Sequence, residues 1–160
     1  MTQLRLLTIF KSKFWFRLFL MKSLPAAFFC GLNLNSLTEE RSVVIVRFSW
    51  FTQNPFRSIY FACLAMAAEM SSGVLALIHS QHLTPKVSML VMGMSAEFHK
   101  KAIGKIRFEC NDGAKISRVV EDVVKNQIGL VCETHSKGFD EQGDCVADFF
   151  IKWTFRQKSK

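Results

Sequence analysis

A single carboxylate, Glu69, lies near the middle of a long apolar segment over residues 58–79, SIYFACLAMAAEMSSGVLALIH. Ala, Met and Leu dominate this segment and no proline interrupts it, so its composition predicts a helix that is apolar on every face. Such a helix must be buried, and burial raises the pKa of an unpaired carboxyl group. A carboxylate with a raised pKa is suited to act as a base near neutral pH, so Glu69 is the first candidate for a chemical role.

The other residue types that do chemistry form no clear pattern along the chain. His79 and His82 lack further ligands at zinc-site spacing, so we expect no metal. Ser71 and Ser72 lack the Gly-x-Ser-x-Gly context of a serine nucleophile. The five cysteines are odd in number and include no Cys-x-x-Cys pair, which favours reduced, buried thiols in a cytoplasmic protein over a disulfide framework. They are Cys30, Cys63, Cys110, Cys132 and Cys145.

The chain of 160 residues has a globular composition and a strong positive charge. It is 49% hydrophobic and 21% charged, with a formal net charge of +8. The excess of cations favours anionic partners such as phosphate-bearing molecules, membrane surfaces or nucleic acid. No nucleic-acid-binding motif accompanies the charge, so we expect no nucleic-acid partner. The length suits one domain over residues 1–160, with a helical extension over 1–30.

Residues 10–23 predict an amphipathic helix that ends before Pro25. Four cations interrupt its apolar residues too closely for the apolar region of a signal peptide. These cations are Lys11, Lys13, Arg17 and Lys22. We expect this helix to cover the hydrophobic core. The alternative is that it lies on a membrane surface through its basic and aromatic side chains.

The remaining residues predict strands, with one further helix inserted between them. The predicted strands are 42–50, 86–99, 103–110, 128–135 and 145–155. Residues 114–126 have apolar residues on one face, as an amphipathic helix does, at Ile116, Val119, Val120, Val123 and Val124. The polar turn at 138–143 predicts a hairpin of the last two strands.

The strands decide where the long helix is buried. Residues 59–78 could span a bilayer, but Glu69 would then lie in the hydrocarbon at a cost of about 2.5 to 3.5 kcal/mol. The sheet formed by the strands also needs a cover for its apolar face. A helix wrapped by a curved antiparallel sheet buries both surfaces, so we expect one α+β domain rather than a membrane span.

The residues around Glu69 resemble a motif of the hotdog-fold thioesterases, in which a curved antiparallel sheet wraps a central helix. The phenylacetyl-CoA thioesterase-like branch has Asn-x-x-Gly-Thr-x-His-Gly-Gly at the start of this helix, with Asp or Glu nine residues after the His. Asn54, Ser58 and Glu69 match this motif by position and type. The chain is also similar to an uncharacterised hotdog group with an extra N-terminal helix.

Two later segments extend the resemblance. Phe98-His-Lys-Lys-Ala102-Ile-Gly104 resembles the aromatic-x-Arg-Pro-Ala-x-x-Gly strand of the family, one residue short, and residues 143–147 resemble its Gly-x-x-Val-Ala hairpin. The resemblance implies a hotdog core over about residues 31–156, with an N-terminal helix added and another helix inserted between strands.

The start of the long helix departs from the family motif. Tyr60 stands where the family has His, Phe61 and Ala62 where it has Gly-Gly, and Arg57 where it has Gly. In the family, glycines let the backbone approach a thioester carbonyl, and backbone N–H groups polarise that carbonyl. The side chain of Phe61 narrows the space through which a carbonyl could approach the backbone, although the N–H of Tyr60 could still polarise that carbonyl.

The resemblance implies an acyl-CoA thioesterase-like hydrolase that needs no cofactor, with coenzyme A as part of the substrate. Glu69 then acts as general base on water or as nucleophile, Asn54 orients the water or the carbonyl, and Tyr60 donates a hydrogen bond. The implied substrate-binding residues are Ser58, Phe61, Lys100, Lys101 and Lys105, with the lysines as candidates for the coenzyme A phosphates.

The resemblance also implies a homodimer or a dimer of dimers, because the active sites of hotdog relatives are built from both subunits. The alternative function is a non-catalytic hotdog module that binds an acyl chain or an acyl-CoA. The replaced glycines at Phe61 and Ala62 favour that alternative. Glu69 could equally be a paired polar residue at a dimer interface.

Overall fold

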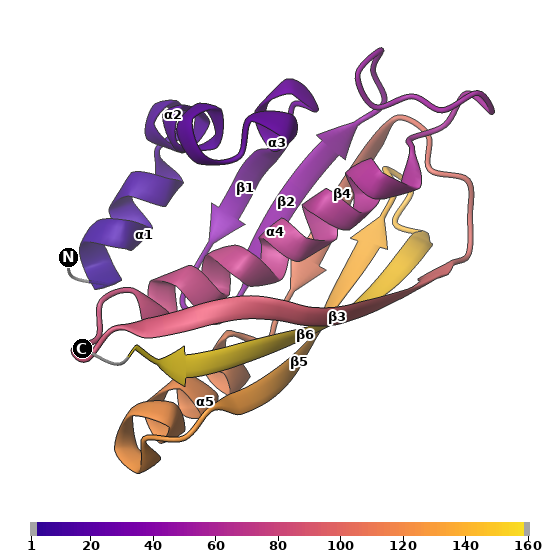
Figure 1. Cartoon of the computed structure of the whole chain (residues 1–160). Coiled ribbons are helices and arrows are strands. Elements are labelled where there is room, and N and C mark those ends of the chain that lie inside the picture. The colour runs from indigo at the N-terminus through magenta and orange to yellow at the C-terminus, as the bar shows by residue number, and fades with distance from the viewer. Residues whose placement is uncertain (1–2, 159–160) are drawn as a thin grey trace.

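A six-stranded antiparallel sheet curves around a long helix in the computed structural model, which describes residues 3–158 (Figure 1). The strands lie in the order β1-β2-β4-β5-β6-β3. They are β1 (Asn33–Leu37), β2 (Ser42–Arg47), β3 (Val87–Phe98), β4 (Lys105–Cys110), β5 (Leu130–Phe139) and β6 (Cys145–Gln157). The helices are α1 (Gln3–Lys11), α2 (Lys13–Ser23), α3 (Pro25–Phe29), α4 (Phe61–Ser80) and α5 (Gly113–Asn126).

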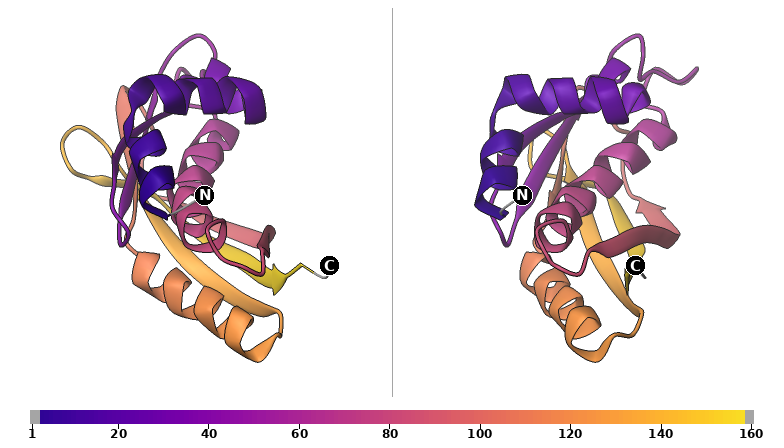
Figure 2. Two further views of the ribbon diagram at one scale, coloured as in Figure 1. Left: turned by 90° about the vertical axis from the view of Figure 1, so that its left-hand side faces the viewer. Right: turned by 60° about the vertical axis from the view of Figure 1, so that its left-hand side comes forward.

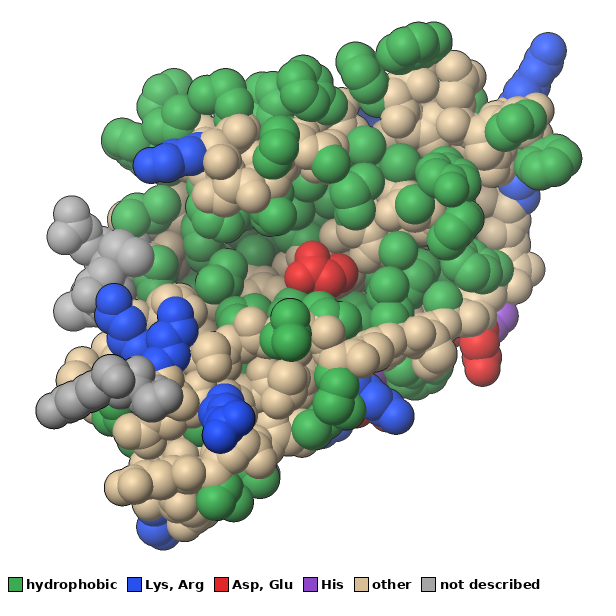
Figure 3. Space-filling model, viewed as in Figure 1, with side chains coloured by type: hydrophobic (Ala, Val, Ile, Leu, Met, Phe, Trp, Pro, Cys, Tyr) green, Lys and Arg blue, Asp and Glu red, His purple; other side chains and the backbone are tan. Residues whose placement is uncertain are grey.

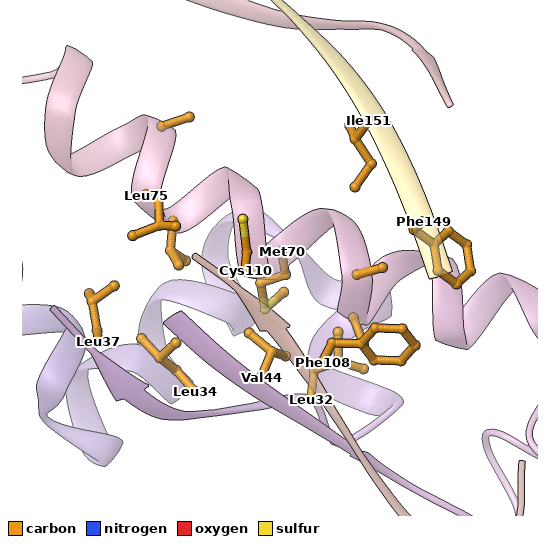
Figure 4. Packing of buried hydrophobic residues seen from close by; sticks show 14 of the residues in the cluster. Leu32, Leu34, Leu37, Val44, Met70, Leu75, Phe108, Cys110, Phe149 and Ile151 are labelled. Atoms are coloured by element: carbon orange, nitrogen blue, oxygen red, sulfur yellow. The ribbon is translucent and has the colours of Figure 1, made fainter. Parts of the chain in front are cut away.

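The long helix α4 lies in the concave side of the sheet and packs on β2, β4, β5 and α5. Within residues 3–158 it is the one helix long and apolar enough to cross a membrane. Its apolar surface is instead buried by protein: Figure 4 shows Val44, Phe108 and Cys110 of neighbouring strands beside Met70 and Leu75 of the helix. This confirms the predicted α+β class, with a curved antiparallel sheet around a central helix.

Helix α5 is inserted between β4 and β5, as the sequence predicts. Its buried residues are Ile116, Val120 and Val123, and the helix contacts α4, β5 and β6; Figure 2 shows it running alongside β5. Gly113 at its start lies against the backbone of Glu39 and Glu40, where a Cβ atom would collide. The helix therefore begins at glycine, because only glycine fits this close approach.

The chain preceding the sheet forms three short helices rather than one helix over 10–23. Ser12 separates α1 from α2, and Pro25 starts α3. Helix α2 covers the core through Phe16 and Leu20, which are fully buried. Its opposite face is exposed and also apolar. The exposed apolar side chains of α2 are Phe14, Trp15, Leu18 and Met21.

Several element boundaries differ from the prediction for local reasons. Strand β1 was not predicted. It lies at an edge of the sheet, and the short segment Asn33–Leu37 has only a weak alternation of polar and apolar residues. Helix α4 starts at Phe61 rather than at residue 58, since the N–H of Ile59 donates to the carbonyl of Ala102 and holds the chain extended. The predicted hairpin of the last two strands is confirmed, and β5 runs on to Phe139.

Candidate active site

Glu69 borders a cavity of about 260 Å³ between α4, α2 and the edge of the sheet. The lining is almost entirely apolar: Phe19, Ser23, Leu24, Met70, Gly73, Val74, Leu77, Met89 and Trp153. Figure 3 shows an acidic group in a hollow of this face, surrounded by hydrophobic side chains. The carboxylate is therefore half-buried and still reachable from the surface.

The Glu69 carboxylate has no hydrogen-bond or ion-pair partner in the described part of the chain. Desolvation by its surroundings raises its pKa above the ordinary 4.5. Gly73 leaves the space that the carboxylate occupies, because a Cβ at this glycine would lie 3.1 Å from Oε1 of Glu69. The indole of Trp153 is fixed beside it, with Nε1 donating to Oγ of Ser72 at 2.9 Å. Glu69 thus offers free lone pairs in an apolar setting.

Asn54 is engaged by its own turn. Its Oδ1 accepts hydrogen bonds from the backbone N–H of Phe56 at 3.0 Å and from the N–H and hydroxyl of Ser58 at 3.2 and 3.1 Å. Oδ1 of Asn54 is therefore already engaged within the turn and is not free for the predicted role. Arg57 completes the turn with φ of 55°, the left-handed region where the family motif has glycine.

The start of α4 presents backbone donors, but not the one predicted. The N–H of Tyr60 donates to the carbonyl of Thr52 at 2.7 Å and cannot also polarise a substrate. The N–H groups of Phe61 and Ala62 follow it in the first turn, where α-helices leave donors unpaired. These two groups, at the positive end of the helix dipole, can stabilise a developing oxyanion.

The predicted lysines have different surroundings. Lys100 donates to Asp140 and Asp144, both at 2.6 Å, and these hydrogen bonds raise its pKa. Lys105 lies 3.6 Å from Glu141. Lys101 is exposed, has no ion pair among residues 3–158, and lines a second cavity of about 320 Å³ at the start of α4. Lys101 is thus the predicted lysine best placed to meet a phosphate.

The predicted site residues, apart from Lys105, fall into two groups within one chain. Glu69 lines one cavity, and the other, at the start of α4, is lined by Asn54, Ser58, Tyr60, Phe61, Lys100 and Lys101. Nine residues of helix separate Tyr60 from Glu69, which is about 13 Å along the axis. One chain alone does not bring the carboxylate to the backbone donors.

The structure also assembles a cluster that sequence reasoning missed. His99, His135, Cys145 and Asp148 meet on the outer face of the sheet, from β5, β6 and the residue after β3. No spacing along the chain reveals this cluster, because it depends on the pairing of β3 and β5 with β6. The prediction of no metal site considered only neighbouring histidines.

Residues 14–155 match the family described as Domain of unknown function (DUF4442). Among solved structures, PA5026 of Pseudomonas aeruginosa, a protein of unknown function and probable thioesterase, is 21% identical over 89% of this chain and 95% of its own, with a TM-score of 0.76. The thioesterase HI1161 of Haemophilus influenzae is 13% identical, covering 88% of both chains, with a TM-score of 0.64.

The PaaI protein of the E. coli phenylacetic acid degradation operon is 14% identical over 92% of this chain and 94% of its own, with a TM-score of 0.64. No curated protein matches the chain. The structural likenesses confirm the hotdog fold that the residues around Glu69 predict.

The raised pKa of Glu69 predicts a pH-dependent stability difference between wild type and Glu69→Gln. Below the unfolded-state pKa, near 4.5, Glu69 is protonated in both states and its burial lowers the free energy of unfolding least. As pH rises towards and through the higher folded-state pKa, the buried carboxyl must ionise, and the free energy of unfolding of wild type falls. Glu69→Gln therefore gains stability relative to wild type between pH 4.5 and neutrality, measured by urea unfolding at fixed chain concentration.

Asp122→Asn, at an exposed position of α5, controls for the loss of one charge. A difference between wild type and Glu69→Gln that stays constant across this pH range would contradict the desolvation of Glu69.

Proposed function

Since the chain belongs to the DUF4442 family and has the hotdog fold, we propose that it is an acyl thioester hydrolase that uses Glu69 as its catalytic carboxylate. The observation that carries this proposal is an unpartnered carboxylate in an open, apolar cavity. A carboxylate held only for structure is normally paired when it is shielded from water. The raised pKa brings its basicity closer to that needed near neutral pH.

The reaction is the attack of water on the thioester carbonyl carbon. Glu69 takes a proton from the water as the C–O bond forms, and the N–H groups of Phe61 and Ala62 stabilise the oxyanion. Collapse of the intermediate breaks the C–S bond, and the carboxyl of Glu69 returns its proton to the leaving thiolate. Alternatively Glu69 attacks the carbon directly and forms an anhydride as the C–S bond breaks and the thiolate leaves. Water then hydrolyses the anhydride, which regenerates the Glu69 carboxylate, and the proton released from this water goes to the thiolate.

The apolar cavity accommodates the acyl group, and the cavity at the start of α4 receives coenzyme A. Phe19, Met89 and Trp153 offer apolar and aromatic contacts beside Glu69. Lys101 supplies a positive charge for a coenzyme A phosphate at the other cavity. The substrate class is therefore an acyl-CoA or a similar acyl thioester.

A homodimer completes this site. Strand β3 is an edge strand of twelve residues that pairs only with β6 in the described chain. Its exposed side chains are apolar at Leu90, Met92, Met94 and Phe98. Such an edge favours pairing with another strand. A two-fold pairing of β3 with its copy sets the two α4 helices antiparallel, which brings Glu69 of one chain towards the helix start of the other.

Binding of an acyl-CoA without hydrolysis is the second candidate function. The specific observation that favours it is the ring of Phe61, 57% exposed at the start of α4, where the family motif has glycine. This ring and the adjacent Tyr60 ring, 4.9 Å away between centroids, narrow the approach of a carbonyl to the helix. The thiol-release experiment below separates the two functions.

Glu69→Gln is expected to reduce the release of free thiol from acyl-CoA by at least about 100-fold in kcat, because the amide cannot accept the proton. The measurement uses a panel of acyl-CoA substrates of increasing chain length and an aromatic acyl-CoA. Asp122→Asn, at an exposed position of α5 that lines neither cavity and lies outside β3, serves as the control and keeps wild-type turnover. Unchanged turnover in Glu69→Gln sinks the proposed role. Tight binding by wild type with no thiol released from any substrate favours the second candidate.

Two inactive variants are expected to restore activity when they share a dimer. Phe61→Pro removes the N–H of Phe61, and proline is well tolerated at the first helical position. A dimer of one Phe61→Pro chain and one Glu69→Gln chain retains one intact site. Co-expression with different tags therefore yields mixed dimers with about half of wild-type turnover if the two sites are independent.

Phe61→Ala, which keeps the N–H, is the matched control for loss of the ring. Mixed dimers as inactive as the two parent variants would show that Glu69 and the helix start do not act across the dimer.

A further inference from the structure

The outer face of the sheet carries a compact set of metal-binding side chains, separate from the Glu69 cavity. Nε2 of His99 lies 2.8 Å from Oδ2 of Asp148, and Sγ of Cys145 lies 3.4 Å from the same oxygen. All three ligand atoms lie within 4.8 Å of one another. From this geometry we propose that His99, Cys145 and Asp148 bind a divalent cation of the zinc type.

The spacing of these atoms suits tetrahedral coordination. Zinc binds nitrogen and oxygen at about 2.0–2.1 Å and sulfur at about 2.3 Å, which sets neighbouring ligand atoms about 3.3–3.7 Å apart. The contact of Cys145 with Asp148 already has this length, and that of His99 with Asp148 needs to widen by about 0.5 Å. Three protein ligands leave the fourth position to water.

The second oxygen of Asp148 is held by His135, which acts as a positioning residue. Nε2 of His135 lies 2.5 Å from Oδ1 of Asp148, and its ring stacks on Phe150 with centroids 4.5 Å apart. The backbone N–H of His99 donates to the carbonyl of Val146 at 2.9 Å, which fixes the third ligand beside β6. Partners that orient a ligand in this way strengthen metal sites.

The charges of the donor set balance a divalent cation. Cys145 binds as thiolate, releasing its proton to solvent, and Asp148 binds as carboxylate, while His99 remains neutral. The two negative charges neutralise the metal. In the absence of a cation the hydrogen-bonded carboxylate of Asp148 opposes ionisation of the thiol, so the same geometry does not activate Cys145 as a nucleophile.

Titration with Co²⁺ tests this site, because tetrahedral cobalt bound to a thiolate has visible bands and a sulfur-to-metal charge-transfer band. Protein cleared of metal with a chelator is expected to bind one Co²⁺ per chain with that charge-transfer band, and added Zn²⁺ removes it. Cys145→Ser loses the band, and Asp148→Asn weakens Co²⁺ binding by at least about tenfold. His135→Gln weakens binding but keeps the band.

Cys30→Ser is the matched control, because Cys30 is another half-buried thiol distant in sequence from the cluster. It keeps the band and the affinity, and circular dichroism checks that every variant is folded. The absence of a thiolate band in wild type overturns the proposal, as does a band that survives in Cys145→Ser.

A second and independent observation is the outward face of α2, which is apolar although it is exposed. Phe14 is 71% exposed, while Phe16 and Leu20 on the opposite face are buried. Helix α3 lies beside α2, since the guanidinium of Arg17 lies 4.0 Å from the centroid of the Phe28 ring in α3. A helix that is apolar on both faces calls for a second apolar neighbour.

The surface extends to the loop that follows β2. Phe29 of α3 stacks on Phe51 with centroids 6.1 Å apart, and the adjacent Trp50 is 77% exposed. Figure 3 shows hydrophobic side chains along this edge of the molecule, over α2 and α3. We name it the α2 surface: Phe14, Trp15, Leu18, Met21, Phe29, Trp50 and Phe51.

The positive charge around the α2 surface indicates which kind of partner it binds. Lys11, Lys13 and Lys22 are exposed and form no ion pair within residues 3–158, and no acidic residue precedes Glu39 in the sequence. Aromatic and aliphatic side chains with flanking lysines are typical of helices that lie in a membrane interface. We infer that the α2 surface docks on an anionic lipid bilayer, while Phe16 and Leu20 cover the core.

Vesicle flotation tests the docking, with vesicles of phosphatidylcholine alone and with a third of phosphatidylserine. Wild type is expected to float with the anionic vesicles. The double variant Trp15→Ser/Met21→Ser is expected to stay in solution. Lys13→Glu and Lys22→Glu each weaken binding at least about fivefold. Ile128→Ser, at an equally exposed apolar position beyond α5, floats like wild type.

Failure of wild type to float with anionic vesicles overturns the inference. So does a change of oligomeric state in Trp15→Ser by analytical ultracentrifugation, because the α2 surface would then be covered by a second copy of the chain.

Discussion

The structure depends on the burial of a helix that has no polar face. Helix α4 places small residues such as Ala67, Ala68 and Ala76 against the sheet, so that the strands approach closely and curve around it. The sheet, α5 and the first three helices cover most of its circumference. The part left open lies between α2 and β3, and the one carboxylate of the helix emerges there.

This arrangement explains why Glu69 is accessible and yet unpaired. Its mostly apolar neighbours remove water and no described residue donates a hydrogen bond to the carboxylate, whereas Gly73 and the gap beside β3 leave room for another molecule. Met89 of β3 lies at this opening, whereas the first turn of α4 lines the second cavity. Hydrophobic burial therefore gives the fold its stability and also creates the surface on which the proposed chemistry and dimer depend.

Much of the fold could be predicted from the sequence, because the spacing of apolar residues and the composition of each segment indicate directly which faces are buried. The valines of 114–126 predicted α5 to within one residue, and the apolar residues of 58–79 predicted a wrapped central helix. Strand β1 was not predicted, because an edge strand with polar side chains has little hydrophobic periodicity. The break between α1 and α2 at Ser12 was not predicted, because the pattern of apolar residues continues through it.

The site was less predictable, because single hydrogen bonds decide its details. Glu69 follows from its apolar context, but the engagement of Asn54 Oδ1, of the Tyr60 N–H and of Lys100 depends on partners brought close only by folding. Arg57 is instructive: its left-handed backbone explains why a related motif has glycine there. The cluster around Asp148 depends wholly on strand pairing.

The carboxylate of Glu69 is desolvated, has no partner among the described residues and borders an open cavity. A carbon-13 NMR titration of the glutamate carboxyl groups, assigned with Glu69→Gln, measures this directly. We expect a midpoint above 4.5 for Glu69 and a change in its signal when a non-hydrolysable acyl-CoA analogue is added. A midpoint at or below 4.5, with no response to the analogue, would contradict this description of Glu69.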